Sequence, residues 1–80
     1  MTHADLFIRL MAEHADISID EARFIFEDFR SKVPGPEYLD RELNDKEADI
    51  MINLYRRDRA VMQLISQVMK AYGRRPLPSV

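Results

Sequence analysis

The sequence predicts an all-α protein: a small helical bundle in which two short helices and a short connecting helix pack on a long C-terminal helix. Capping residues, apolar residues spaced by three and four, and the lack of strand-like alternation all favour this class. Eighty residues suffice for one small domain. We expect residues 1–73 to form it and residues 74–80, which contain two prolines, to be a flexible tail.

Three helix starts carry a capping residue followed three positions later by an acid. Such a side chain accepts a hydrogen bond from an unpaired amide of the first turn, and the acid can accept one from the backbone amide of the capping residue. These signals place helices at about 3–14, 19–33 and 45–72. The pairs are Thr2 with Asp5, Ser18 with Glu21, and Asn44 with Glu47.

The stretch "KVPGPEYLDREL" interrupts the helical pattern. Pro34 and Pro36 cannot continue the second helix, and Gly35 allows the chain to leave it. Pro36 is favoured in a first turn, so we expect a short connecting helix from there to Leu43. Gly73 ends the last helix.

Apolar stripes mark the faces that we expect to form the core. A broad stripe of this kind normally touches more than one neighbouring element. In the second helix the stripe is Ile19, Ala22, Phe26, Phe29 and Val33. In the third helix it is Ile50, Leu54, Val61, Leu64, Ile65, Val68 and Tyr72, extended on one side by Met51, Met62 and Met69.

Asp58 is the anomaly of the third helix, because a helical projection places it within the apolar stripe. Either the helix breaks near Tyr55–Arg57 and Asp58 caps a new one, or the helix continues and Asp58 is partly buried beside a cation. The stretch "YRRDRA" contains neither Gly nor Pro, and this propensity argument favours continuity. A continuous helix would be about 42 Å long, whereas a globule of this size is only about 30 Å across.

An over-long helix would leave apolar surface that a second copy could cover, so we expect a homodimer, or binding to a protein partner. Phe24 and Ile52 support this expectation, because both fall outside the expected core stripes. The predicted interface consists of Phe24, Met51, Ile52, Met62, Met69 and Tyr72.

Charge is divided unevenly along the chain. Residues 1–49 hold 13 acidic and 6 basic residues, a net charge of −7, and residues 50–80 hold 6 basic residues and one acid, a net of +5. This asymmetry suggests either a phosphate-bearing partner or pairing between the two halves. The candidate contacts for nucleic acid are Arg56, Arg57, Arg59, Lys70, Arg74 and Arg75.

Catalytic and metal-binding motifs are not recognisable, so we expect no enzyme, no cofactor and no metal. His3 and His14 lie about 16 Å apart on a helix, too far to share an ion. The stretch "DRELNDKEADIM" resembles a calcium loop but lacks its glycine and its final glutamate. No apolar run could span a membrane and no signal peptide is recognisable, so we expect a soluble, cytoplasmic protein.

The stretch "ADLFIRLMAEHADISIDEA" resembles the opening helical hairpin of the HU-type bacterial histone-like proteins. The resemblance rests on Leu6, Leu10, Met11 and Ala22 and ends at Val33. In that family the hairpin mediates dimerisation, which fits the expected oligomer. The DNA-gripping β-arms have no counterpart here, so the resemblance does not imply DNA binding. The leading interpretation is a non-catalytic protein-protein interaction or oligomerisation module, with regulation of a partner protein as one role open to it. The alternative is a nucleic-acid-associated accessory protein.

Overall fold

The computed structural model describes residues 1–33 and 35–73, and over these ranges the chain is helical with no named strand, as predicted. The connecting helix is a single 3₁₀ turn, and the region expected to form one long helix contains two. The elements are α1 (His3–Ala15), α2 (Ile19–Lys32), η1 (Glu37–Asp40), α3 (Asp45–Arg57) and α4 (Arg59–Ala71).

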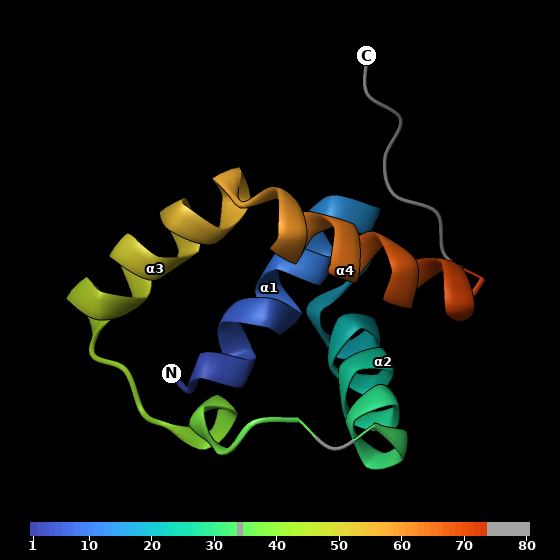
Figure 1. Cartoon of the computed structure of the whole chain (residues 1–80), viewed down its shortest axis with the longest axis horizontal. Helices are drawn as coiled ribbons and strands as arrows, with labels where there is room; N and C mark the ends of the chain where they lie inside the picture. The colour runs from blue at the N-terminus through green and yellow to red at the C-terminus, as the bar shows by residue number, and fades with distance from the viewer. Residues whose placement is uncertain (34, 74–80) are drawn as a thin grey trace.

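Helix α1 lies at the centre of the molecule, with the other elements arranged around it (Figure 1). Helix α2 lies on one side, and α3 and α4 form an arch on the other. The N-terminus is tied to the segment after η1, since the amide of Leu43 donates to the Met1 carbonyl at 2.8 Å and that of His3 to the Arg41 carbonyl at 3.0 Å. The principal extents are 32, 31 and 22 Å.

The predicted caps are confirmed. Thr2 and Asn44 each form a reciprocal capping box, with Asp5 and Glu47 respectively. The hydroxyl of Ser18 accepts a hydrogen bond from the Glu21 amide at 3.1 Å. These side chains satisfy amides that the first turn of a helix leaves without a partner, which fixes where α1, α2 and α3 begin.

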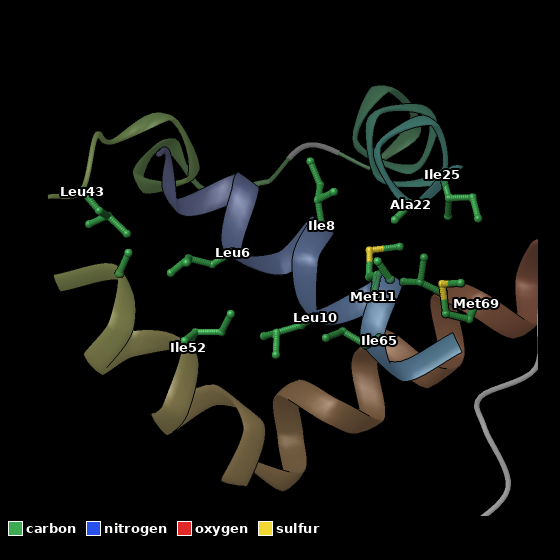
Figure 2. Close-up of a cluster of buried hydrophobic side chains, with 13 residues drawn as sticks. Leu6, Ile8, Leu10, Met11, Ala22, Ile25, Leu43, Ile52, Ile65 and Met69 are labelled. Carbon is green, nitrogen blue, oxygen red and sulfur yellow. The ribbon is translucent and has the colours of Figure 1, made fainter. Parts of the chain in front are cut away.

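The core forms around two faces of α1. Figure 2 shows Leu6 and Leu10 of α1 directed toward Ile52 of α3 and Ile65 of α4. On another face, Met11 lies beside Met69 of α4 and the inner side of α2. Because α1 contacts each of the other helices, its apolar side chains hold the whole fold together.

The expectation of a continuous C-terminal helix is wrong. Asp58 has an extended backbone, with φ −85° and ψ 112°, and it serves as the C-cap of α3 and the N-cap of α4. Its Oδ1 accepts hydrogen bonds from the amides of Ala60 at 2.9 Å and Val61 at 3.2 Å. Asp58 is solvent-exposed, so it needs no buried cation. A side chain that satisfies two amides competes with helix continuation, even though the segment contains neither glycine nor proline.

The break also explains why Ile52 was misplaced. On a straight helix, 13 residues separate Ile52 from Ile65 by about 140° around the axis, which puts Ile52 on the polar side. The bend at Asp58 resets the orientation of α3, and both residues face α1, with Ile52 only 4% exposed. No 42 Å rod forms, so the argument for a homodimer based on an over-long helix fails.

Replacing Asp58 by alanine should lower the free energy of unfolding by about 1 kcal/mol, because two amides of α4 lose their acceptor. Urea unfolding followed by circular dichroism measures the change. Asp58→Asn retains an acceptor and should keep most of the stability. The matched control is Asp49→Ala, at an exposed aspartate within α3; an equal loss in that variant would show that the cap at Asp58 has no special role.

Candidate apolar groove

An open groove of about 280 Å³ lies where α2, the segment after it, η1 and α4 approach α1. Apolar side chains form almost all of its wall. A smaller apolar hollow of about 50 Å³ shares Phe7, Phe26, Phe29 and Leu64 with it, so the two lie side by side. The groove is lined by Phe7, Phe26, Phe29, Arg30, Val33, Gly35, Pro36, Tyr38, Leu39 and Leu64.

Aromatic rings form the floor of the groove. The ring of Phe7 stacks with that of Phe26 at a centroid distance of 6.3 Å and with that of Tyr55 at 5.3 Å. Such pairs fix ring orientation, and each contributes about 1 kcal/mol beyond the area that it buries. The floor is therefore a pre-formed apolar surface rather than a gap between mobile side chains.

Three large apolar side chains form the rim, and each comes from a different part of the chain. Val33, which follows α2, is 50% exposed, Tyr38 of η1 is 49% exposed, and Leu64 of α4 is 51% exposed. A single exposed apolar residue is ordinary, but a contiguous group is typical of an interaction site.

Two cations at the groove, Arg30 and Lys32, are paired within the chain. Arg30 donates a 2.8 Å hydrogen bond to Asp40, and Lys32 pairs with Asp28 at 3.0 Å. The hydrogen bond from Arg30 lowers the pKa of Asp40. The pKa of Asp28 is lowered by a hydrogen bond from the Tyr72 hydroxyl and then by one from Lys32. No buried side-chain nitrogen or oxygen in the described ranges lacks a partner. The groove thus offers mainly apolar contact, and Arg30 in its lining is already held by Asp40.

His3 supports the wall of the groove from behind. The His3 side chain is almost buried, and its Nε2 shares a 2.6 Å hydrogen bond with the Tyr55 hydroxyl. Its ring also lies 4.7 Å from that of Tyr38 and 5.7 Å from that of Phe7, both of which line the groove. Burial, and then the nearby Arg41 charge, lower the pKa of His3 below its ordinary value.

The residues predicted as an interface do not form one surface. Phe24 is 68% exposed on the outer face of α2. Met51, Met62 and Tyr72 are half-buried against the core, and the Tyr72 hydroxyl donates to Asp28. Ile52 and Met69 are buried within the core. These last two cannot present surface to a partner while the chain keeps this fold.

The basic residues predicted to contact phosphate are also dispersed. Arg56 donates to both carboxylate oxygens of Glu13 on α1, at 2.7 and 3.1 Å, so it joins the acidic half to the basic half. Arg57, Arg59 and Lys70 are exposed and make no ion pair with the part of the chain that the structure describes. The residues outside that part include Arg74, Arg75 and the rest of the predicted tail, 74–80.

The sequence did not predict the groove because the residues of its rim come from separate parts of the chain. Tyr38 and Leu39 belong to "PGPEYL", which reads as a linker. Gly35 lies so close to Leu39 that a Cβ on this glycine would come within 2.8 Å of the leucine Cδ1, so the glycine permits the close turn that forms this wall. The available signal was the pair Tyr38 and Leu39, one residue after the sequence Pro-Gly-Pro.

Among residues 1–33 and 35–73, no cluster of three or more His, Cys, Asp or Glu side chains could hold a metal ion. Within the same ranges, no helix combines the length and apolar character needed to cross a membrane. Comparison with known protein families, with curated proteins and with solved structures found no match for this chain. The likeness to the HU-type hairpin therefore rests on its residues alone.

Protonation of His3 should destabilise the fold. The pKa of His3 is lower in the folded state than in the unfolded chain, so folding favours the neutral ring. The contribution of His3 to the free energy of unfolding is therefore fully present above about pH 6.5, and it falls as the pH drops from there toward the folded-state pKa. Urea midpoints between pH 8 and pH 5.5 measure this slope. His3→Gln should flatten it, whereas Gln67→Ala, at an exposed position of α4, should retain it. Equal slopes for wild type and His3→Gln would contradict the assignment.

Proposed function

We propose that this chain is a non-catalytic interaction module that binds an amphipathic helix of a partner protein in the apolar groove. The observation that carries the proposal is the convergence of Val33, Tyr38 and Leu64 on the aromatic floor. A partner helix held in the groove could not make its other contacts, so the module would regulate that partner.

The size and chemistry of the groove favour side chains over a small ligand. Ligand and cofactor sites have volumes of roughly 300–1,000 Å³ and include a few precisely placed polar groups. The volume here is about 280 Å³ and the groove is open. Among the described residues, Arg30 is the one charged residue in its lining, and it is paired with Asp40. One or two large apolar side chains, presented by a folded segment, suit such a site.

The recognition mode follows from what surrounds the groove. Strand addition requires a free sheet edge, and residues 1–33 and 35–73 contain only an isolated bridge between Thr2 and Glu42. A helix, in contrast, could lie along α4, where Ala60, Leu64 and Ala71 are exposed at spacings of four and seven. The two alanines permit close approach, and Leu64 joins this face to the groove.

The second candidate function, nucleic-acid association, has a weaker basis than the sequence suggested. Arg56 is held by Glu13, so the contiguous basic face expected on a straight helix loses one member. The bend at Asp58 separates Arg57 of α3 from Arg59 and Lys70 of α4. What supports this candidate is the exposure of those three cations. Binding of a DNA duplex distinguishes it from helix binding.

A labelled helical peptide with leucines at positions i, i+4 and i+7 should bind the chain, as measured by fluorescence anisotropy. Leu64→Glu should weaken binding at least tenfold, because it places a charge in the apolar groove. Binding should change little between 50 and 500 mM NaCl, since the contact is apolar and the nearby Arg30 and Lys32 are internally paired.

The matched control is Gln63→Glu, which adds the same charge at the neighbouring exposed position of α4 and should bind normally. A non-amphipathic peptide of the same composition serves as the second control. Equal binding by wild type and Leu64→Glu would refute the groove as the site. Salt-sensitive binding of a generic DNA duplex, lost on replacing Arg59 and Lys70 by glutamate, would support the nucleic-acid function instead.

A further inference from the structure

The outer face of α3 carries two exposed aliphatic residues between two cations. Lys46, Ile50, Leu54 and Arg57 are spaced by four, four and three, which places them within about 80° around the helix axis. Ile50 is 53% exposed and Leu54 is 61% exposed. Neither Lys46 nor Arg57 makes an ion pair with any described residue. We call these four residues the basic face.

The outer face of α2 carries the opposite pattern. Asp20, Phe24, Glu27 and Ser31 lie within about 60° around that helix, and all four are exposed. Phe24 is the most exposed large apolar residue among those described, and it lies between two carboxylates that have no ion pair there. We call these residues the acidic face.

We propose that the acidic face of one copy packs on the basic face of a second copy, so that Phe24 inserts between Ile50 and Leu54. The two faces are complementary in charge, and the exposed aromatic side chain of one can lie between the two exposed aliphatic side chains of the other. Buried aromatic anchors supply much of the free energy at interfaces, and opposite charges around them orient the contact and increase the rate of association. This proposal does not depend on the groove.

The spacing along the two helices is compatible with this contact. We take Phe24 to lie at the midpoint between Ile50 and Leu54. Along the helix axis, Asp20 and Glu27 then lie about 6 and 4.5 Å from this midpoint. Lys46 and Arg57 lie about 9 and 7.5 Å from it, in the same order. The difference of about 3 Å at each end is within the reach of a lysine or arginine side chain. Each carboxylate can therefore meet a cation of the other copy.

The two faces lie on opposite sides of α1, because α2 and α3 do (Figure 1). The contact is therefore head-to-tail: each copy offers one face to one neighbour and the second face to another. Interfaces of this kind produce closed rings or open chains rather than simple two-fold dimers. This differs from the homodimer expected from the sequence.

Sedimentation velocity on the full chain tests the proposal. At 50 mM NaCl the wild-type sedimentation coefficient should rise with concentration beyond the value for two copies, and 500 mM NaCl should weaken the association at least tenfold. Phe24→Asp and Leu54→Asp should each sediment as monomers. An equimolar mixture of the two variants should form a one-to-one dimer and nothing larger, because only one intact face of each remains.

Charge reversal provides a second test. A chain with Asp20→Lys and Glu27→Lys and a chain with Lys46→Glu and Arg57→Glu should each be monomeric, whereas their mixture should assemble. Far-ultraviolet circular dichroism and urea unfolding establish that every variant is folded. Gln63→Glu is the surface-charge control and should assemble like the wild type.

A wild-type chain that remains monomeric up to millimolar concentration would overturn the proposal, as would mixtures that fail to associate. Leu64→Glu should assemble normally, and Phe24→Asp should bind the helical peptide normally. Failure of self-assembly is thereby distinguished from failure of the groove as a helix-binding site.

Discussion

The hydrogen bonds from the amides of Ala60 and Val61 to the Asp58 carboxylate are the local constraint that turns the chain between α3 and α4, and the packing of both helices on α1 depends on that turn. They end one helix and start the next, with no unusual backbone angle. The bend allows Ile52 of α3 and Ile65 of α4 to face the same central helix (Figure 2). It also places Leu64 beside α2 and η1, where it forms part of the rim of the groove. One exposed carboxylate thus affects both the core and the candidate site.

The central position of α1 explains how so short a chain buries an apolar core without a disulfide. Small domains bury a modest fraction of their surface, so each helix must contribute a large part of its apolar face. Two ion pairs at the surface help to orient neighbouring helices on α1. Arg56 of α3 pairs with Glu13, and Arg23 of α2 pairs with Asp5. Exposed pairs of this kind contribute roughly 0–1 kcal/mol each, so packing around α1 is the larger contribution.

The sequence was most informative where the physics is local. Thr2, Ser18 and Asn44 marked three helix starts correctly, because a cap depends only on residues within one turn. At Asp58 two local effects compete, since helix propensity favours continuity and the carboxylate favours a cap. Packing on α1 adds a third contribution that residue spacing does not reveal. Because the bend changes the orientation of α3, a projection on one straight helix put Ile52 outside the core, where it is in fact buried. The groove was not predicted because Val33, Tyr38 and Leu64 meet only after folding.

The two proposed surfaces differ in the interactions that they would use, and α2 contributes to both. Phe24 points away from the core, whereas Phe26 lies about 160° around the helix and lines the groove. A neighbour packed on the outer face of α2 would therefore leave the groove open. Because the groove has paired charges and the outer faces have unpaired ones, salt would affect assembly strongly and helix binding weakly. An assembled chain of copies could then present several grooves in a row, which would increase the avidity for a partner that carries more than one helix.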